Sequence, residues 1–426
     1  MSSTSRLLEK WGLPDLTRNG RFVTANVMDS LGNGLLLAFT VVYFTTTTSL
    51  SLGSIGGALS LGHLLALLTP VVAGSLIDRF GSRTVVIAAN LVSAAGFCAF
   101  LAADSVWKIV AVQFVVQAGS STYWTASRGL VLLAADRRDQ ARWFGFIGAL
   151  RNIGGGFGVA VASAAVAVDD GWVRALVLLD ALTFVVAAIL IATWHPAAAE
   201  RPKPAARTAA SNGYATVLRD AHYMRLILAN VSFVLAASVL PVLLTLYVTE
   251  ALHAGAWLAG ACILGNMALI ATVQTLVARM IERHRPTRVL ALAGVVNAAA
   301  FAVFGVLLAL PGGAVTAGLL VAMAVFTLAE MLSMPSSSEL SATLAPEHIR
   351  GRYLGAFQLS WSLGNALAPA LLTTLLGYGP AWPWVVLGAL NLIAVPLLLG
   401  LRETAPHDRA QEEPAGTTAP QGGTSP

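Results

Sequence analysis

Long apolar segments recur along the whole chain, and they constrain its fold more than any other feature. Runs of 18 or more mostly apolar residues are centred near residues 34, 64, 93, 122, 155, 183, 235, 267, 298, 327, 363 and 391. A helix of that length crosses about 30 Å of hydrocarbon, whereas the alternating segments of a membrane barrel are absent. Helices also satisfy their backbone hydrogen bonds internally. The sequence therefore predicts an all-α integral membrane protein with twelve transmembrane helices.

Composition and charge agree with a membrane protein. Hydrophobic residues make up 56% of the chain and charged residues only 11%, against about a quarter in soluble domains. With the N-terminus inside, 22 of the 26 lysines and arginines fall in segments on that side, so the positive-inside rule predicts that both termini are cytoplasmic. The basic residues form no single patch, which argues against a nucleic-acid partner. The two cysteines, Cys98 and Cys262, lie inside predicted spans and form no metal motif.

The chain repeats itself at a shift of 204 residues. The charged loop from Gly74 to Arg83 returns at Ala278 to Thr287, and the same shift pairs Asn26 with Asn230, Val27 with Val231, Tyr43 with Tyr247, Asp78 with Glu282, and Arg79 with Arg283. At a shift of 210, Arg142-Trp143-Phe144-Gly145 matches Arg352-Tyr353-Leu354-Gly355. This self-similarity indicates a duplication. Because only the first loop keeps both glycines, a tight latch is predicted under the first half and an acid-base remnant, Glu282 with Arg283, under the second.

Changes in composition divide the chain into five predicted parts. A cytoplasmic N-terminus covers 1–20, a first helical bundle 21–194, and a cytoplasmic central loop 195–221. A second bundle covers 222–401, and a tail at 402–426, rich in Pro, Gly and Thr, buries too little apolar area to fold and is expected to be disordered.

The loop between the second and third spans reads Gly-x-Leu-x-Asp-Arg-x-Gly-x-Arg, and with six helices on either side of a basic central loop it resembles the major facilitator superfamily. The resemblance covers nearly the whole chain. It implies two pseudo-symmetric six-helix bundles that move about a central site in alternating access. It also implies that the loop acts in gating, through Gly74, Asp78, Arg79, Gly81 and Arg83.

A second resemblance concerns the drug/proton antiporter branch of that family. Glu330-Met331 with Pro335, followed by a loop at 350–355, looks like the tenth span and following loop of twelve-helix exporters. Two positions depart from the branch pattern. Gln113 stands where that branch usually has arginine, and Gly158-Val159 stands where it has Gly-Pro.

Polar residues at helical spacing mark faces that could form a path through the membrane. They lie on the first, fourth, fifth and eleventh spans. The candidates for lining a cavity or binding substrate are Asn26, Asn33, Gln113, Gln117, Trp124, Arg128, Arg151, Gln358, Trp361 and Asn365. For any single amide, hydrogen bonding between helices is an equally good interpretation.

The ionisable residues within the spans give sharper hypotheses, because a charge in mid-membrane costs about 2.5–3.5 kcal/mol. Asp29 and Glu330 are the candidates for proton coupling. Asp29 and Arg151 are predicted at similar depth and could form an ion pair, either structural or coupling, and Arg128 could be a gate or a cavity anchor. His63 could relay a proton, but it has no ionisable partner nearby in the sequence, so packing is the favoured interpretation. Asp180 is placed near the outer end of its span, in contact with solvent.

These features predict a secondary active transporter in a bacterial inner membrane, with a small molecule, protons and membrane lipid as partners, and functional as a monomer. Proton-coupled export of small amphipathic molecules is the favoured function, since aromatic residues and methionines on the polar spans suggest a roomy, adaptable cavity. Proton-coupled import of a sugar or other metabolite is the alternative. An enzyme such as a lipid-modifying transferase is disfavoured for lack of clustered acids or histidines. No cofactor is expected, because no Gly-x-x-x-x-Gly-Lys loop occurs.

Overall fold

The computed structural model describes residues 18–37, 40–135, 139–168, 172–196 and 213–401. The tail predicted at 402–426, and most of the predicted N-terminal segment and central loop, lie outside these residues. The helices of the first half are α2 (Gly20–Leu37), α3 (Thr40–Thr47), α4 (Leu52–Leu65), η1 (Ala66–Leu68), α5 (Thr69–Phe80), α6 (Ser82–Phe100), α7 (Val106–Ala134), α8 (Gln140–Val168) and α9 (Trp172–Thr193).

The second half begins with a short helix that precedes its first long one. Its helices are α10 (Gly213–Arg219), α11 (Ala221–Ala237), η2 (Val239–Leu243), α12 (Leu244–Leu246), η3 (Tyr247–Ala251), α13 (Ala256–Ile281), α14 (Pro286–Val306), η4 (Leu307–Ala309), α15 (Gly312–Thr343), η5 (Glu347–Ile349), α16 (Arg350–Tyr378) and α17 (Trp382–Leu399). Each of the twelve predicted span centres falls within one of these helical stretches. The predicted all-helical membrane fold is therefore confirmed.

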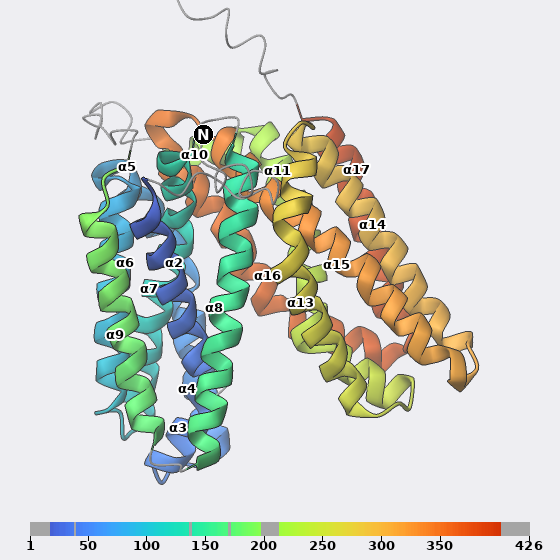
Figure 1. The fold of residues 1–426 in the computed structure, drawn as a ribbon, viewed down its shortest axis with the longest axis horizontal. Helices are drawn as coiled ribbons and strands as arrows, with labels where there is room; N and C mark the ends of the chain where they lie inside the picture. Colours follow the sequence, from blue (N-terminus) through green and yellow to red (C-terminus); the bar gives the residue numbers. More distant parts are fainter. Residues whose placement is uncertain (1–17, 38–39, 136–138, 169–171, 197–212, 402–426) are drawn as a thin grey trace, which may run out of the picture.

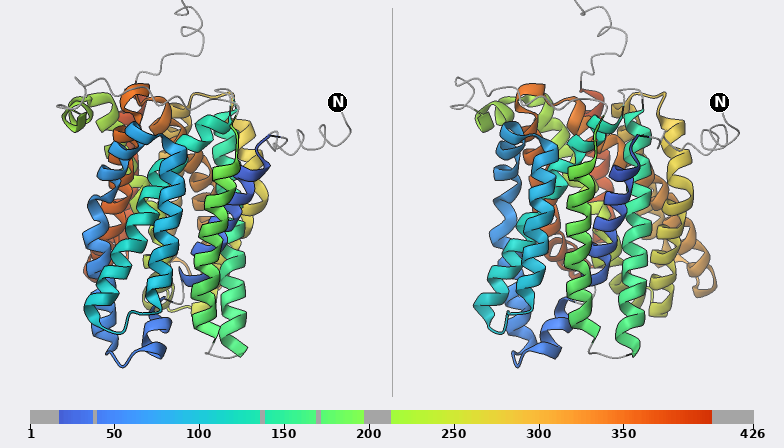
Figure 2. Two further views of the ribbon diagram at one scale, coloured as in Figure 1. Left: turned by 90° about the vertical axis from the view of Figure 1, so that its left-hand side faces the viewer. Right: turned by 60° about the vertical axis from the view of Figure 1, so that its left-hand side comes forward.

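The helices form two bundles, α2 to α9 and α11 to α17, which meet at one end of the molecule and separate towards the other (Figures 1 and 2). We call the end that carries α10, Asp78 and Glu282 the closed end, and the opposite end the open end. Across the closed end, α5 packs against α16 and α8 against α13. The two bundles thus enclose a space that widens towards the open end.

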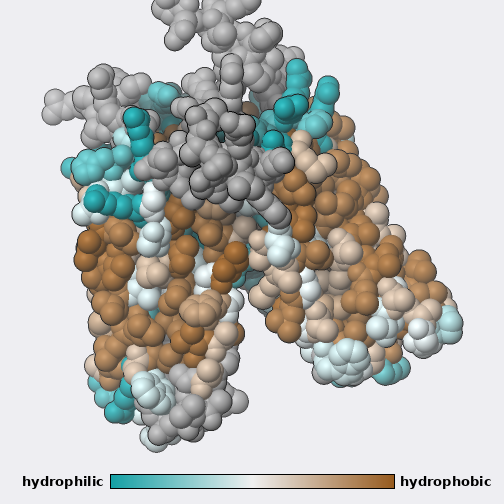
Figure 3. All heavy atoms as spheres, viewed as in Figure 1, coloured by the Kyte–Doolittle hydropathy of each residue, from teal (hydrophilic) through white to brown (hydrophobic). Residues whose placement is uncertain are grey.

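The face of the two bundles seen in Figure 3 is largely apolar between its ends. Brown, hydrophobic side chains cover the flanks in Figure 3, and teal, hydrophilic ones gather towards the ends. Among the described residues, ten helical segments are long and apolar enough to span a membrane. The long helix α7, which carries several of the polar candidates, is not one of the ten.

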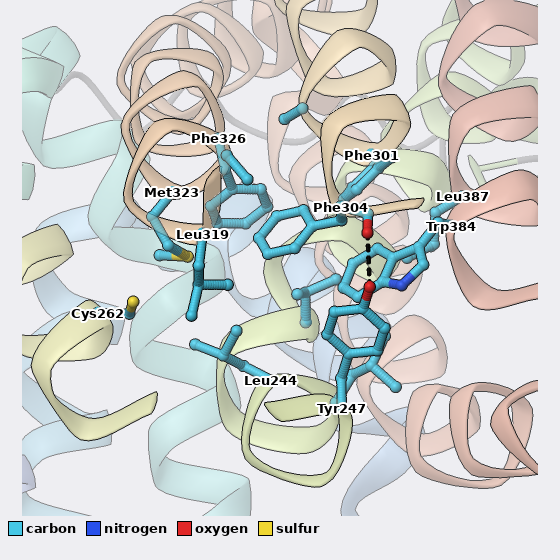
Figure 4. Packing of buried hydrophobic residues seen from close by; sticks show 14 of the residues in the cluster. Leu244, Tyr247, Cys262, Phe301, Phe304, Leu319, Met323, Phe326, Trp384 and Leu387 are labelled. Carbon is cyan, nitrogen blue, oxygen red and sulfur yellow. Dashed lines mark hydrogen bonds between the residues drawn. The ribbon is translucent and has the colours of Figure 1, made fainter. Parts of the chain in front are cut away.

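The predicted duplication is visible in the cores of the two bundles. The hydroxyl of Tyr43 donates a hydrogen bond to the carbonyl oxygen of Phe100 over 3.2 Å. In the second half, the hydroxyl of Tyr247 donates to the carbonyl oxygen of Phe304 over 2.5 Å, beside the ring of Trp384 (Figure 4). Both members of the second bond lie 204 residues after their counterparts, so the repeat extends to a buried contact between side chain and backbone.

Candidate functional site

A cavity of about 1170 Å³ lies between the two bundles. Its walls come from α4, η1, α7 and α8 of the first half and from α13, α15 and α16 of the second. Apart from six serines, the polar and aromatic residues among its walls are His63, Gln117, Trp124, Arg128, Phe144, Arg151, Asn152, Gln274, Glu330, Gln358, Trp361 and Asn365. Eight of these twelve are among the residues predicted from the sequence.

The stripe predicted on α7 reaches the cavity at Gln117, Trp124 and Arg128, which lie at helical intervals on one face. The Nη1 atom of Arg128 donates to the carbonyl oxygen of Trp124 and to Oε1 of Gln358, each over 2.9 Å. Its guanidinium carbon lies 5.0 Å from the centroid of the Phe357 ring. Arg128 therefore lines the cavity and also joins α7 to α16 of the other bundle.

Glu330 on α15 faces the same cavity from the second bundle. Its Oε2 accepts a hydrogen bond of 2.9 Å from the amide of Asn266 on α13, and the same amide donates to Thr327 over 3.0 Å. A small pocket lined by Glu330, Trp361 and Met334 lies beside it. Glu330 is thus held by one neutral donor and is open to the cavity, so it can exchange a proton or bind a cationic group.

Arg151 on α8 faces the cavity from the first bundle. Its Nη2 atom donates to Oδ1 of Asn26 over 3.0 Å and to the hydroxyl oxygen of Tyr123 over 3.2 Å. Its guanidinium carbon lies 4.4 Å from the centroid of the Trp124 ring. The hydrogen bonds of Arg151 therefore go to Asn26 and Tyr123, and on Asp29 it acts only as a nearby charge.

Four of the predicted residues are not among the walls of the cavity. Asn26 and Asp29 are buried behind Arg151, and the amide of Asn33 donates to the carbonyl oxygen of Asp29 over 2.7 Å. Gln113 is buried, with its Nε2 atom 3.0 Å from Nδ1 of His63. Helical spacing grouped these residues of α2 correctly, but Asn26 and Asp29 are turned towards neighbouring helices of their own bundle, and Asn33 is exposed without lining the cavity.

The acid of the charged loop contacts the opposite bundle. Oδ1 of Asp78 accepts a hydrogen bond of 2.6 Å from the backbone N–H of Gly351, and its Oδ2 lies 3.7 Å from Nε of Arg352. In the second copy, Oε2 of Glu282 lies 2.8 Å from Nη2 of Arg142. The acid of each loop thus pairs with an arginine of the other bundle. The partner of Glu282 is Arg142, which the predicted remnant of Glu282 with Arg283 did not include.

The two glycines of the first loop have different tasks. Gly74 allows close contact between helices, because a Cβ atom added there would lie 2.6 Å from the carbonyl oxygen of Gly351. Gly81 ends α5 with a φ of 81°, a conformation that favours glycine.

The two predicted arginines of this loop stay within the first bundle. Nε of Arg83 donates to the carbonyl oxygen of Ile191 over 3.1 Å, and Nη2 donates to that of Ala192 over 2.6 Å. Arg83 therefore ties α6 to the end of α9. Arg79 is exposed and lies over the ring of Phe80, at 5.1 Å from its centroid.

Tyr214 is a contact at the closed end that the sequence did not reveal. It lies on α10, and its hydroxyl donates to the carbonyl oxygen of Val71 on α5. The same hydroxyl lies close to Gly74 and Gly355, where added Cβ atoms would approach it to 2.6 and 3.0 Å. Burial, followed by the nearby charge of Asp78, raises the pKa of Tyr214 to about 12. The segment before α11 is thus attached to the junction of α5 and α16.

Several further residues of the site were missed. His63 was interpreted as a packing residue, yet it lines the cavity and contacts Gln113. Tyr123, which bonds to Arg151, was missed, as were the cavity residues Phe144, Asn152 and Gln274. The helical spacing of Tyr123 differs from that of the predicted stripe on α7, so a search for one polar face passes over it.

Comparisons with known proteins agree with this architecture. A sequence model described as Major Facilitator Superfamily matches residues 22–369 and 226–423. A multidrug resistance protein, MdtH of Aeromonas hydrophila subsp. hydrophila, is 25% identical over 393 residues, which cover 90% of this chain and 95% of that protein.

Solved structures show the same fold at low sequence identity. The transporter FucP in its outward conformation matches with a TM-score of 0.74 at 15% identity, over 91% of this chain and 99% of that one. The human organic anion transporter MFSD10 matches with a TM-score of 0.69 at 16% identity, over 89% of this chain and 98% of that one. The family model matches most of the chain, and the structure has two helical bundles with a cavity between them. The chain therefore belongs to the major facilitator superfamily and is a multi-pass membrane transporter.

Proposed function

We propose that this transporter exports small amphipathic molecules in exchange for protons, by alternating access. The observation that carries the proposal is the central cavity of about 1170 Å³, in which a carboxyl group, Glu330, faces a space lined by Trp124, Trp361 and Met334. Aromatic rings and a flexible thioether adapt to molecules of different shape, and a carboxylate attracts cationic ones. The similarity to MdtH over most of both chains supports the same substrate class.

The structure is interpreted as an outward-facing state in the bacterial inner membrane. The closed end carries Arg79, Arg83, Arg142, Arg279 and Arg283, so by the positive-inside rule it faces the cytoplasm, and both termini lie there. Export then requires the contacts of Asp78 with Gly351 and of Arg142 with Glu282 to break, so that the cavity opens towards the cytoplasm. Residues 21–194 and 222–401 are the two units that move.

Glu330 is the proposed site at which a proton and the substrate compete. In the outward-facing state it is open to the cavity and can take up a proton from the outside. Return of the cavity to the cytoplasmic side lets the proton leave, and the restored carboxylate can then receive a cationic or amphipathic substrate. Arg128 and Arg151 supply positive charge on the opposite wall, which orients polar groups of the substrate.

Import of a sugar is the second candidate, because the amides of Gln117, Gln358 and Asn365 line the same cavity and can hydrogen-bond hydroxyl groups. The structural match to FucP shows the fold alone and does not decide between the two.

Transport by the purified protein in liposomes with an imposed pH gradient tests the proposal. We expect ethidium to be moved against its gradient by the parent protein and by Glu250→Gln, a matched change at an exposed carboxyl near the open end. Glu330→Gln should lose this uphill transport by about tenfold or more while downhill movement remains, and Asp29→Asn should weaken it as well. Unchanged uphill transport in both variants would refute the coupling role. If the protein does not move ethidium but accumulates fucose or xylose in the liposomes, it is an importer instead.

A further inference from the structure

Asp180 on α9 is a buried acid that the transport cycle above leaves without a role. Its side chain is fully buried, and neither of its carboxylate oxygens has a hydrogen-bond partner among the described residues. The prediction that it meets solvent is therefore wrong. Buried polar groups in proteins almost always form hydrogen bonds, and a buried carboxyl group without a partner favours its neutral, protonated form over the charged one.

Asp180 lies against α2, the helix that carries Asp29. A Cβ atom added to Gly32 would lie 2.5 Å from Oδ1 of Asp180 and 2.2 Å from Oγ1 of Thr183. Gly32 follows Asp29 by three residues, so both lie on one face of α2. Asp29 is itself 2% exposed, its Oδ1 has no hydrogen-bond partner among the described residues, and its charge acts on Asp180. The two buried carboxyl groups thus lie on packed helices, with Asp180 against the position one turn after Asp29 on α2.

Among the described residues, Arg151 is the one positive charge that acts on this pair. Arg151 from α8 and the hydroxyl of Tyr123 from α7 act on Asp29. From α6, the ring of Phe97 stacks on Phe184, four residues after Asp180 on α9, with the centroids 5.6 Å apart, so the contact with α6 next to Asp180 is apolar. Two carboxylates beside one guanidinium leave an uncompensated negative charge inside the bundle, which is strongly unfavourable. The charge balances when the pair holds one proton.

The second bundle shows that packing does not require such acids. The residue 204 positions after Asp29 is Phe233, whose ring reaches the α14 glycine Gly294. The residues 204 and 210 positions after Asp180 are Trp384 and Leu390, and neither is ionisable. Apolar residues therefore stand in the second bundle where two unpartnered acids stand in the first.

A proton suits this place better than a metal ion. The close contact at Gly32 leaves no room for a hydrated cation, and the described residues contain no group of three or more His, Cys, Asp or Glu side chains that could hold a metal. A proton needs no volume. It also has a polar route from the cavity, because Arg151 lines the cavity and bonds to Asn26 and Tyr123 directly beside Asp29.

We propose that Asp29 and Asp180 share one exchangeable proton and act as a single second coupling site behind the wall of the cavity. This inference rests on the proposed function only in making that proton part of the transport cycle. A proton held by the pair leaves the first bundle electrically balanced beside Arg151. Release of the proton leaves one excess negative charge on the pair. This charge attracts Arg151 more strongly and draws its guanidinium group away from a substrate in the cavity.

Infrared difference spectra of the purified protein in lipid nanodiscs, recorded during a pH titration, test this without any substrate. The carbonyl band of a protonated carboxyl group reports the shared proton. We expect the parent to show one release step that moves by about one pH unit or more in Asp29→Asn and in Asp180→Asn alike, because strongly coupled sites titrate as a pair. The double variant should lose no more than one carboxyl step. Glu330→Gln is the matched control and should leave this step in place.

Independent behaviour of the two acids would overturn the proposal. If Asp180→Asn leaves the step of Asp29 unmoved, or if the double variant loses two separate steps, no proton is shared. A measurement on the unmutated protein guards against a folding defect. With ¹³C-labelled aspartate, the two side-chain signals should move together at one midpoint, and separate midpoints refute the pair. Failure of ethidium transport would leave these results standing, so the two proposals can fail separately.

Discussion

Replacing Gly351 by alanine should open the closed end of the transporter. Gly351 begins the α16 contact with α5, and an added Cβ atom would lie 2.2 Å from the carbonyl oxygen of Gly74, 2.7 Å from Oδ1 of Asp78 and 2.8 Å from Cβ of Ile77. An ordinary contact begins at 3.4 Å, so α5 and α16 must part by about 1.2 Å at this point. The nearest atom belongs to the backbone of a packed helix and cannot rotate away.

Overpacking of this kind costs about 1–3 kcal/mol. Because the strain exists only while the bundles are in contact here, it acts on the closed-end contact rather than on folding of either bundle. The ratio of cytoplasm-open to outward-facing molecules should therefore rise by about 5- to 150-fold. The hydrogen bond from the backbone N–H of Gly351 to Oδ1 of Asp78 should also lengthen and weaken.

Distances between spin labels measure this change directly. One pair would join the exposed residues Thr84 on α6 and Arg288 on α14 at the closed end, and another would join Lys108 and Trp257 at the open end, with Cys98 and Cys262 replaced. We expect the first distance to lengthen and the second to shorten in Gly351→Ala. Gly265→Ala on α13 is the control, since a Cβ atom there meets nothing within 4 Å. Distances that match the control would refute the assignment of this contact as the one that limits opening.

Two further predictions concern the same end of the molecule. Tyr214→Phe removes one hydrogen bond, worth about 0.5–1.5 kcal/mol, and should increase the cytoplasm-open population by at most about tenfold, read from the same closed-end labels. Since the pKa of Tyr214 is raised to about 12, its contribution is complete below the ordinary tyrosine value of 10.0 and is lost only as the pH rises through about 12, so the parent distances should not change between pH 6 and 9. Glu282→Gln should weaken closure by about 1 kcal/mol, since Glu282 and Arg142 are each 19% exposed, and the effect should shrink in high salt. Equal effects at low and high salt would contradict this electrostatic origin.

The fold could be predicted from the sequence because the membrane leaves few choices. Apolar length decides which segments span the membrane, and every predicted span centre lies in a helix of the structure. The repeat shift of 204 residues predicted equivalent positions in the two halves, and the buried bonds of Tyr43 and Tyr247 obey it. The breaks within spans were not predicted: the π-helical turn η2 contains Pro241, whose nitrogen cannot donate a helical hydrogen bond, and the turn η3 contains no proline.

The site was predictable only as far as a single helix determines it. The spacing on α7 and α16 placed Gln117, Arg128 and Gln358 on faces that do line the cavity. Which side a polar face takes depends on the neighbouring helices, and so the face of α2 with Asp29 was assigned to the cavity although it is buried in its own bundle. Asp180 shows the same limit, because its depth in the span gave no sign that Gly32 would bring α2 against it.

The two crossed contacts at the closed end show how a duplicated loop can give an asymmetric gate. Asp78 and Glu282 each lie close to an arginine of the other bundle. Because these ion pairs are partly exposed, water can replace either partner at a small cost in free energy. In the first copy, Gly74 and Gly351 have no side chains, so the backbones of α5 and α16 come into contact. In the second copy, Ala278 keeps its side chain, and a Cβ atom added to Gly145 would meet the Cβ atom of Ala278 at 2.5 Å. Backbones in contact re-form only in one register, whereas side chains adjust to several. The α5–α16 junction therefore determines where closure must end, and the α8–α13 junction can yield while it does so.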